Sequence, residues 1–351
     1  MRKEIFSKKI MDWYQANQRN LPWRKTTDPY KIWLSEIILQ QTRVAQGLPY
    51  YKRFVDAFPA VLDLAKAPVQ KVLRLWQGLG YYTRARNLHR CAKLIVRDFE
   101  GHFPNSFEGL KKLPGIGPYT AAAIASIAFR EPVAVVDGNV FRVLARIFGI
   151  DKDIASDAGK KYFFSLANEL LDEAHPDIFN QAVMEFGALH CLPKNPKCDE
   201  CTFSKQCEAN QKDLQNLLPV KHKKLKIRTR YFYYFIVRDK NKMLLKQRNG
   251  KDIWQGLYDF HLIETSRRKK TAEVVKTDAI LTKASILKES RVFRHLLSHQ
   301  KLLVKFVELK LRSTKEMNLL ARRSELKKFT KPEISNLPKP ILIDRYLKAN
   351  P

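Results

Sequence analysis

The stretch LPGIGPYTAAAIASIAF, residues 113–129, decides the character of the first part of this 351-residue chain. Two glycines, Gly115 and Gly117, stand in a short turn before a run rich in alanine, and glycine lets a backbone approach a partner closely. The helix expected after the turn begins with free N–H groups, which form an anion site. The turn therefore predicts sequence-independent binding of phosphate, although a G-x-G turn alone also fits an ordinary connection between helices.

The residues around this stretch read as one helix after another. Apolar side chains recur at helical spacing from Ile5 to Tyr14 and from Tyr30 to Ile38, and Pro and Gly separate such segments. The basic run KHKKLKIRTR at 221–230 ends this pattern. The chain beyond it contains largely apolar, strand-like runs at Tyr231–Val237, Met243–Leu245 and Leu302–Leu309. We therefore predict an all-α domain over 1–215, a basic linker over 216–230 and a smaller α/β domain over 231–351.

Basic side chains dominate the composition. The chain has 65 Lys and Arg against 35 Asp and Glu, a formal net charge of +30. Residues 221–351 alone hold 34 basic and 12 acidic side chains. Such a field favours a nucleic acid or an anionic membrane as partner, and it also serves solubility.

The remaining composition predicts a soluble intracellular protein, and the absence of a targeting extension favours a bacterial-type cytoplasm. We expect a monomer. Five cysteines in a chain of this length do not make a disulfide scaffold, and the charges within Met1–Gln18 do not suit a signal peptide. The longest uncharged run, Leu113–Phe129, holds two Gly and two Pro and is a poor transmembrane helix. We expect no contact with a membrane.

Four cysteines lie in one short segment with the spacing C-x6-C-x2-C-x5-C: Cys191, Cys198, Cys201 and Cys207. Thiols this close bind a metal or pair in disulfides, and a cytosolic chain favours the metal. Zinc sites with four cysteines usually have two C-x2-C pairs on a longer arm, whereas one such pair between two lone cysteines favours a [4Fe–4S] cluster. Cys91 stands apart in a helical stretch and is expected in the core.

Two carboxylates suggest acid–base chemistry. Glu36 lies in the apolar run IWLSEIIL and has no partner four residues away on its own helix, so desolvation should raise its pKa unless it faces water at the helix edge. Asp137 in VVDGN precedes a helix and is placed either to cap it or to act as a catalytic carboxylate. One neutral carboxylic acid paired with one carboxylate is the arrangement that cleaves glycosidic bonds.

These motifs, in this order, resemble the helix-hairpin-helix DNA glycosylases related to endonuclease III. The runs WLSEIILQQTRV and GLGYYTRARNL are similar to those of the MutY branch, the adenine DNA glycosylases. The resemblance implies a helical glycosylase core with an iron–sulfur loop, followed by a MutT-like, or Nudix-like, domain. It further implies a nucleoid-associated enzyme that removes adenine paired with 8-oxoguanine or guanine in duplex DNA.

The resemblance also implies roles for individual residues. Glu36 would protonate adenine N7, Asp137 would stay ionised beside the oxocarbenium-like sugar, and Asn139 would orient the sugar or Asp137. The residues expected against DNA are the wedge Leu39, Gln41 and Thr42, the adenine-pocket residues Trp23, Arg24 and Gln181, the inserted Tyr81, and the glycines Gly115 and Gly117. Trp23 and Tyr81 also fit ordinary core aromatics.

Tyr119 occupies the hairpin position where bifunctional relatives have a lysine. Because a phenol cannot form a Schiff base, the sequence predicts a glycosylase without lyase activity. A bifunctional enzyme for oxidised pyrimidines and a non-catalytic iron–sulfur DNA-binding protein are the alternatives. Tyr119 argues against the first, and the pair Glu36 and Asp137 argues against the second.

In the second domain, Ser298 and His299 match the Phe-Ser-His loop with which MutT-like modules of this family read 8-oxoguanine. Leu297 stands where the phenylalanine usually is, which weakens any stacking contribution. No acidic REXXEE-type helix is present in the sequence, so pyrophosphohydrolase activity is not expected.

Overall fold

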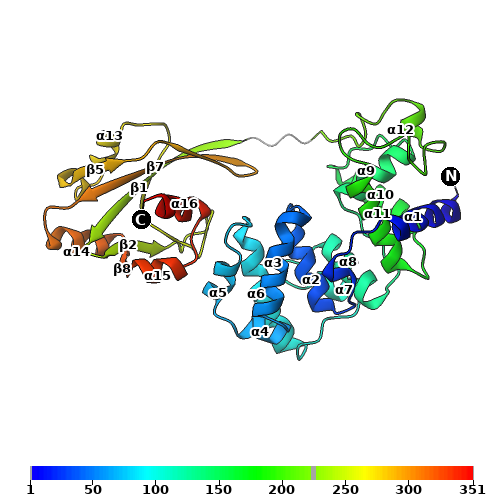
Figure 1. Ribbon diagram of the computed structural model, residues 1–351, viewed down its shortest axis with the longest axis horizontal. Coiled ribbons are helices and arrows are strands. Elements are labelled where there is room, and N and C mark those ends of the chain that lie inside the picture. Colours follow the sequence, from blue (N-terminus) through cyan, green and yellow to red (C-terminus); the bar gives the residue numbers. More distant parts are fainter. Residues whose placement is uncertain (1, 223–226, 351) are drawn as a thin grey trace. The chain divides into compact units, whose positions relative to one another are not determined.

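The computed structural model describes residues 2–222 and 227–350. The chain divides into two compact units (Figure 1). One unit comprises Met1–Lys66 with Asn87–Lys223, and the other comprises Ala67–Arg86 with Lys224–Pro351. Residues 223–226, in the middle of the predicted linker 216–230, lie outside the described residues.

The first unit is helical, as the apolar spacing predicts. Its helices are α1 (Lys3–Asn17), η1 (Pro22–Arg24), α2 (Pro29–Leu39), α3 (Val44–Ala57), α4 (Val61–Lys66), most of α6 (Tyr82–Asp98), α7 (Phe107–Lys111), α8 (Pro118–Phe129), α9 (Gly138–Ile147), α10 (Asp157–Leu170), α11 (Pro176–Leu189) and α12 (Glu208–Gln211). No helix in the described parts of the chain is both long and apolar enough to cross a lipid bilayer.

Helix α8 lies at the centre of this unit because its side chains are small and apolar. Every residue from Thr120 to Ile127 is buried, and α2, α7 and α11 pack against the helix. A second apolar cluster, which includes Phe6, Phe179 and Phe186, joins α1, α9, α10 and α11. Packing therefore fixes α2, α8, α9 and α11, which position the polar side chains described below.

The predicted hairpin connects α7 to α8. Gly115 has φ +80°, a conformation that favours glycine, and a Cβ at this position would lie 2.7 Å from Cβ of Asn87. Gly117 caps α8 and has open space around it. Both glycines are exposed, so the turn presents its backbone to solvent.

The second unit is built on a mixed sheet. Its elements are α5 (Val69–Leu75), β1 (Arg228–Asp239), β2 (Lys242–Gln247), β3 (Tyr258–Asp259), β4 (His261–Thr265), α13 (Thr271–Val275), η2 (Leu281–Lys283), β5 (Ser285–Glu289), β6 (Phe293–Leu296), β7 (Gln300–Lys310), α14 (Thr314–Arg323), β8 (Lys327–Thr330), α15 (Lys331–Asn336) and α16 (Ile341–Ala349). The strand order is β3-β2-β1-β7-β5, with β4 beside β1, β6 beside β7 and β8 beside β2. Strands β1 and β7 are parallel, and the other pairs are antiparallel. The three predicted strand runs are confirmed in β1, β2 and β7.

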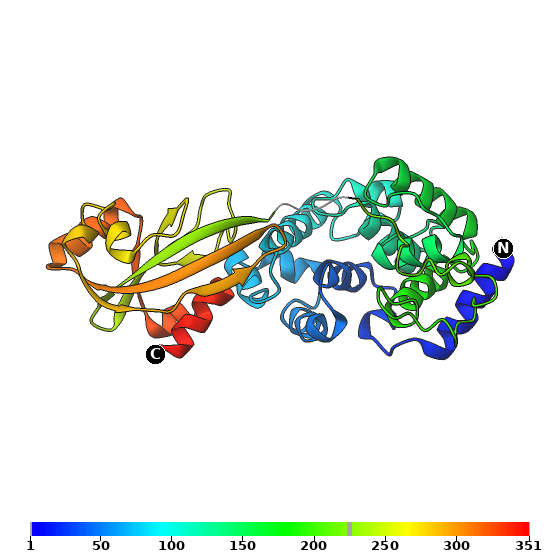
Figure 2. The same cartoon turned by 90° about the horizontal axis from the view of Figure 1, so that it is seen from above.

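Alternation along β1 and β7 gives the sheet two apolar faces. Helix α16, red in Figure 2, covers one face. There Tyr346 stacks on Phe306 with ring centroids 4.1 Å apart. Helices α13 and α14 cover part of the other, where Val274 and Leu320 pack in one cluster with Tyr233. The end of this second face near Tyr231 is left open as a pocket.

Residues 67–86, which the sequence places in the helical domain, group with the second unit. Arg86 donates to the carbonyl of Gln255 at 2.7 Å, and the amide of Lys339 donates to Oε1 of Gln77 at 3.2 Å. These contacts join distant parts of the sequence, so local periodicity carries no sign of them.

Candidate active site

Glu36 and Tyr119 form a hydrogen-bonded pair between α2 and α8. The Tyr119 hydroxyl donates to Oε2 of Glu36 at 2.6 Å. Burial raises the pKa of Glu36 to about 7; the charge of Asp137 adds to the rise, while the Tyr119 hydrogen bond and the charge of Arg24 oppose it. The expected upward shift is thus confirmed, and a carboxyl with this pKa can give or hold a proton near neutral pH.

Tyr119 is itself strongly perturbed. Burial raises its pKa well above the ordinary value of 10.0, and the charge of Glu36 raises it further. The phenol therefore keeps its proton at neutral pH and acts as a donor. Its hydroxyl also lies 3.7 Å from Sδ of Met184 on α11.

Asp137 caps α9. Its Oδ1 accepts the amides of Asn139 and Val140, both at 2.8 Å, and its Oδ2 accepts Nδ2 of Asn139 at 2.8 Å. Arg142 donates in turn to Oδ1 of Asn139 at 2.8 Å. Burial raises the pKa of Asp137, but these hydrogen bonds and the charge of Arg142 favour the ionised form. The roles of helix cap and catalytic carboxylate are compatible for Asp137, because a carboxylate that caps a helix can still accept a further partner.

A buried glutamate that the sequence analysis overlooked lies on α11. Glu185 accepts both Arg24 Nη1 and Nη2 at 2.7 Å and also Nε of Arg19 at 2.8 Å. Burial alone would raise the pKa of Glu185, but the hydrogen bonds from Arg19 and Arg24 outweigh it and hold the pKa at about 2. The sequence does contain a sign of this buried glutamate, because Glu185 stands among apolar residues of a helix as Glu36 does.

The adenine-pocket candidates differ in exposure. Trp23 is buried and packs edge-on against Tyr51, with ring centroids 5.1 Å apart, in agreement with the core-aromatic alternative. Gln181 is partly buried, and its Oε1 accepts the hydroxyl of Tyr14 at 3.3 Å. The guanidinium of Arg24 lies 5.5 Å from the Tyr14 ring centroid. Tyr14 thus joins Arg24 and Gln181 in one polar cluster.

The candidate wedge follows the end of α2. Gln41 is exposed with φ 52°, a left-handed conformation that turns the chain sharply. The amide of Thr42 donates to the carbonyl of Leu39 at 3.0 Å and closes this turn. The side chain of Leu39 rests near Gly47 on α3, where a Cβ would lie 2.7 Å from Leu39 Cδ2.

The cysteine loop follows α11 and is held by two arginines of α9. Arg142 Nε donates to the carbonyl of Cys191 at 2.7 Å, and Arg146 Nη1 lies 3.4 Å from Cys191 Sγ. The same helix therefore carries Asp137 at its start and supports the loop further along. Cys91, in contrast, is fully buried in α6, as predicted.

The four loop cysteines are free thiols. Burial raises the pKa of Cys201 to about 11, and the charges of the other three add to the rise. A backbone amide also donates to Cys201 Sγ, at 3.4 Å. Four neighbouring thiols, two of which face N–H donors, fit the chemistry of an iron–sulfur cluster. As the side chains stand, no three His, Cys, Asp or Glu within residues 2–222 and 227–350 are grouped to hold a metal ion.

In the second unit, Tyr81, Ser298 and His299 line one pocket of about 360 Å³. Ser298 and His299 form the turn between β6 and β7, where Ser298 Oγ lies 3.1 Å from His299 Nδ1. Tyr81 is exposed with φ 47°, and Arg84 lies 5.4 Å from its ring centroid. Its exposure argues against the core-aromatic alternative.

Two protein-family models match the chain. The HhH-GPD superfamily of base excision DNA repair proteins matches residues 34–168, and the NUDIX domain matches residues 233–349. The adenine DNA glycosylase of Buchnera aphidicola subsp. Baizongia pistaciae is 37% identical over 298 residues, which are 84% of this chain and 83% of that protein.

The chain belongs to the adenine DNA glycosylase family. As a member it is a base excision repair enzyme, a hydrolase that acts on N-glycosyl bonds. The human adenine DNA glycosylase is 42% identical over 222 residues, which are 61% of this chain and 41% of the human protein.

Solved structures of DNA glycosylases align with the helical part of this adenine DNA glycosylase. A thermostable thymine-DNA glycosylase aligns with a TM-score of 0.55 and 30% identity over 60% of this chain and 97% of that one. Endonuclease III in a trapped covalent complex with DNA aligns with a TM-score of 0.53 and 21% identity over 61% of this chain and 99% of its own, which shows the shared fold. The expected fold, a helical glycosylase core followed by a Nudix-like domain, is confirmed.

Proposed function

We propose that this enzyme removes adenine paired with 8-oxoguanine or guanine in duplex DNA, with Glu36 as general acid. The observation that carries the proposal is the pKa of Glu36, about 7, in a carboxyl whose Oε2 accepts the Tyr119 hydroxyl. At neutral pH a large share of such a group is protonated and can donate its proton to a base nitrogen, whereas an ordinary glutamate is almost fully ionised.

The proposed reaction divides the work between two carboxyl groups. Glu36 protonates adenine N7, so the base leaves as a neutral species. Asp137 is ionised, and its charge stabilises the oxocarbenium-like sugar as the bond to C1′ lengthens. The three hydrogen bonds that Asp137 receives from Asn139 and Val140 support this ionised role, and they also fix its orientation.

Tyr119 supports a monofunctional mechanism. It stands where a bifunctional enzyme would need an amine, and its hydroxyl hydrogen-bonds Glu36. Water is then the nucleophile at C1′, and the product is an abasic site in an intact strand. Lys111 and Lys112, the nearby amines of the hairpin, are both exposed.

Adenine reaches this site by leaving the duplex, at a cost of roughly a few kcal/mol. We assign Leu39, Gln41 and Thr42 to the wedge that occupies the vacated stack, and the sharp turn at Gln41 supports this role. Trp23, Arg24 and Gln181 line the adenine pocket in this proposal. The hairpin glycines Gly115 and Gly117 bring backbone amides to a phosphate.

The opposite base is the proposed ligand of Tyr81, Ser298 and His299. Their shared pocket in the second unit supports this assignment. The pair of Ser298 Oγ and His299 Nδ1 supplies donors and acceptors for the edge of 8-oxoguanine. Chromosomal DNA of the nucleoid is the corresponding place of action.

We also propose a [4Fe–4S] cluster on Cys191, Cys198, Cys201 and Cys207. The rise that the other three cysteines cause in the pKa of Cys201 and the donation from Arg146 toward Cys191 support it. The cluster would fix the loop that presents the exposed Lys194, Lys197 and Lys205 to phosphate. Purified protein should be brown with four irons per chain, whereas colourless protein with one zinc would contradict the assignment.

The test is a single-turnover reaction on a duplex with one adenine opposite 8-oxoguanine, analysed with and without alkali. Strand breaks should appear only after alkali, and Glu36→Gln should bind the duplex but release no adenine. Glu4→Gln, at an exposed position, is the matched control and should retain activity. Breaks without alkali would identify a lyase, and tight binding without any breaks in the unsubstituted protein would identify a binding module.

A further inference from the structure

Trp254, in the loop between β2 and β3, has a backbone conformation that bulky residues rarely adopt. Its φ is 62°, in the left-handed region, where a large side chain strains the backbone. Tyr81 has φ 47°, and these two are the only aromatic residues with positive φ in the parts of the chain that the structure describes. Both line the opposite-base pocket, of about 360 Å³, together with Ser298 and His299. Strained residues cluster at binding sites, so this shared location points to a role for Trp254 as well as for Tyr81.

Arg248 closes the loop around Trp254. The Nε of Arg248 donates to the carbonyl of Ile253 at 3.1 Å, and its carbonyl accepts the amide of Gly256 at 2.8 Å. The amide of Arg248 donates to the carbonyl of Leu257 at 2.8 Å, and the Leu257 amide donates to the carbonyl of Trp254 at 3.0 Å. These hydrogen bonds lie on both sides of Trp254, so they hold its backbone in the left-handed conformation.

Two carboxylates anchor the guanidinium of Arg248. Its Nη1 donates to Oδ2 of the buried Asp259 at 2.7 Å, and its Nη2 donates to Oδ2 of Asp252 at 3.1 Å. Asp252, which also lines the pocket, accepts the two terminal nitrogens of Arg230 as well, both at 2.8 Å. Two planar guanidinium groups therefore hold one carboxylate of the loop, and such charge-assisted contacts fix its geometry.

The indole of Trp254 packs against the strand that leads to the turn of Ser298 and His299. Its ring centroid lies 5.8 Å from that of His295 on β6 and 6.3 Å from that of Phe232 on β1. Trp254 is only 7% exposed, and it forms part of the pocket wall. A flat ring that is packed in this way offers a rigid surface on which a base can rest.

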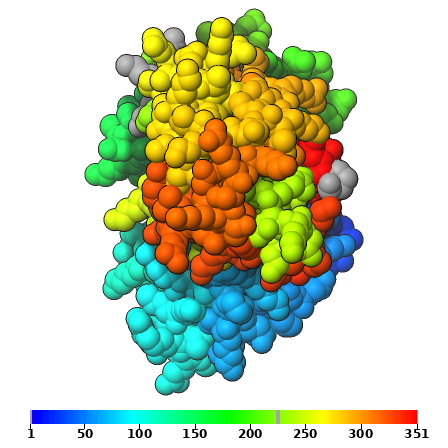
Figure 3. Space-filling model, turned by 90° about the vertical axis from the view of Figure 1, so that its left-hand side faces the viewer, coloured from blue at the N-terminus to red at the C-terminus, as the bar shows by residue number. Residues whose placement is uncertain are grey.

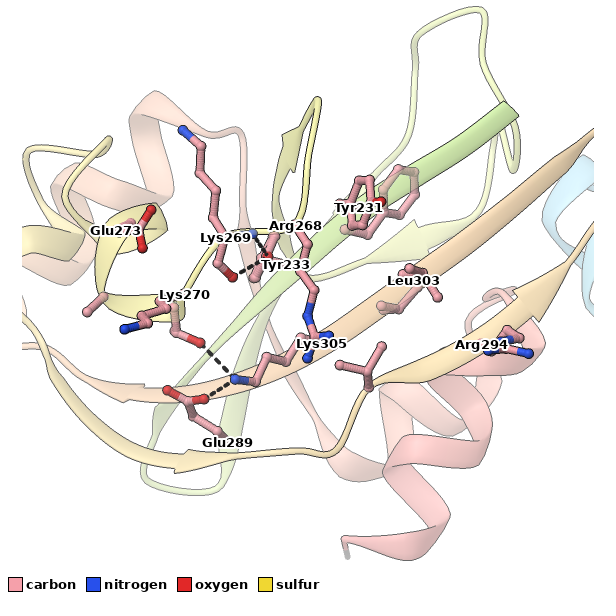
Figure 4. Close-up of a pocket in the computed structure, with 15 residues that line it drawn as sticks. Tyr231, Tyr233, Arg268, Lys269, Lys270, Glu273, Glu289, Arg294, Leu303 and Lys305 are labelled. Atoms are coloured by element: carbon pink, nitrogen blue, oxygen red, sulfur yellow. Dashed lines mark hydrogen bonds and ion pairs between the residues drawn. The ribbon is translucent and has the colours of Figure 1, made fainter. Parts of the chain in front are cut away.

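Trp254 belongs to the face of the sheet opposite the pocket in Figure 4. That pocket, of about 980 Å³, is lined by Arg294 on β6 and by the loop before α13, a segment that is yellow in Figure 3 and lies on the surface of the unit. His295 follows Arg294 directly, so its side chain points to the other face, as β-strand alternation requires. Because the indole packs on His295, its position affects the opposite-base pocket and not the pocket of Arg294.

We propose that Trp254 is a specificity-determining residue of the opposite-base pocket, and that Arg248 and Asp252 position it. The inference rests on the proposed function, in which this pocket receives 8-oxoguanine. The indole fixes the plane of the base, so that the edge of the base meets Ser298 and His299 in one geometry. 8-Oxoguanine has an oxygen at C8 and a proton at N7 that guanine lacks, so its recognition depends more strongly on that fixed geometry.

The experiment compares single-turnover rates of adenine release by the full chain from two duplexes, one with adenine opposite 8-oxoguanine and one with adenine opposite guanine. Trp254→Leu keeps an apolar side chain but removes the flat ring. The ratio of the two rates should fall at least about fivefold, through the 8-oxoguanine duplex, because the stacking surface is lost. Trp254→Phe retains a ring and should keep the ratio within about twofold of the unsubstituted protein.

Asp252→Asn tests the positioning network without a change to the indole. Arg248 keeps its pair with Asp259 but loses its second anchor, so the ratio should fall about two- to fivefold. Asp239→Asn is the matched control, because Asp239 pairs with Lys328 at 2.8 Å and does not line the pocket. The exposed fractions of the two aspartate side chains are similar, 36% for Asp252 and 32% for Asp239. The control should leave the ratio unchanged.

Thermal melting should show that the variants are folded, and Asp252→Asn decides alone if Trp254→Leu does not fold. An unchanged ratio, or equal slowing on both duplexes, would overturn the inference while the proposed function holds. An equal fall of the ratio in Asp239→Asn would also overturn it, since the effect would then come from any lost carboxylate. Unsubstituted protein that releases no adenine from either duplex would overturn the proposed function and the inference together.

Discussion

Two glutamates on apolar helices, Glu36 and Glu185, have pKa values shifted in opposite directions. Burial pushes both pKa values upward, but Glu36 receives one hydrogen bond from a neutral phenol, whereas Glu185 receives hydrogen bonds from two guanidinium groups. The partner, not the burial, decides which carboxyl group keeps its proton. Glu185 serves as a permanent anion that holds Arg19 and Arg24, and Glu36 is left available for proton transfer.

The first prediction concerns the stability cost of Glu36. Its pKa in the folded protein, about 7, exceeds the ordinary 4.5, so the folded state binds more protons between these values and stability falls as pH rises through that range. Glu36→Gln should therefore increase the free energy of unfolding by up to about 3 kcal/mol above pH 7, with little gain below pH 4.5.

Urea unfolding at several pH values checks this prediction. Glu4→Gln controls for the loss of one negative charge from a cationic protein. A gain in stability that is the same at acid and alkaline pH would show that ionisation of Glu36 is not its cause.

The second prediction concerns the phenol of Tyr119. Its hydrogen bond lowers the pKa of Glu36, so Tyr119→Phe should raise that pKa further above 7. If Glu36 acts as the protonated acid, activity is lost as pH rises through its pKa, and the alkaline limb of the profile should move to higher pH in the variant. Single-turnover rates of adenine release across pH measure the shift. An unchanged alkaline limb would mean that another group sets it.

At the scale of elements, the crossing of α9 and α11 is what positions Asp137 and Asn139. Gly187 on α11 faces Asn139 so closely that a Cβ would lie 2.6 Å from Asn139 Cβ and 3.1 Å from its backbone. Arg142 donates to the carbonyl of Gly187 at 2.7 Å and to the Asn139 side chain. A glycine in the last turn of α11 thus lets α9, the helix that Asp137 caps, approach closely.

The third prediction is that Gly187→Ala separates these helices. Alanine favours a helix by about 1 kcal/mol over glycine, but the clash with fixed atoms should outweigh this gain and destabilise the protein by about 1–3 kcal/mol. Adenine release should slow because Asn139 is displaced from Asp137. Melting and single-turnover rates test both effects, with Gly250→Ala, which has open space around it, as control. A more stable and fully active variant would refute this account of the crossing.

At the scale of the whole molecule, the net charge of +30 attracts DNA over a distance, but only contacts with phosphate release counterions. The cysteine loop presents Lys194, Lys197 and Lys205, all exposed, on the same unit as the candidate active site. The effect of the long-range field on DNA binding can therefore be distinguished from the effect of direct phosphate contacts, by removing charges at different places on the molecule.

The fourth prediction is that neutralising these three lysines to Gln flattens the salt dependence of duplex binding. Each lost phosphate contact should reduce the slope of log K against log salt by about 0.9, hence by up to about 3 for the triple variant. Lys240, Lys310 and Lys327, exposed on the second unit, form a control triple of equal charge that should change the slope less. Equal changes in both triples would assign the effect to the field alone.

The sequence by itself determined the elements of this protein and the environment of single residues. Apolar periodicity predicted the helices of 1–215 and the strands β1, β2 and β7, since these patterns depend on near neighbours. The same local reasoning predicted the raised pKa of Glu36, the cap at Asp137 and the burial of Cys91. The family motifs identified the chemistry.

Only the tertiary structure decided which distant residues meet. It gave Glu36 its phenol donor, gave Glu185 its two arginines, and placed residues 67–86 with the second unit, so that Tyr81 shares a pocket with His299. The reason is physical: helix and strand patterns repeat over a few residues, whereas these pairings depend on how packed elements cross, and no local pattern records that geometry.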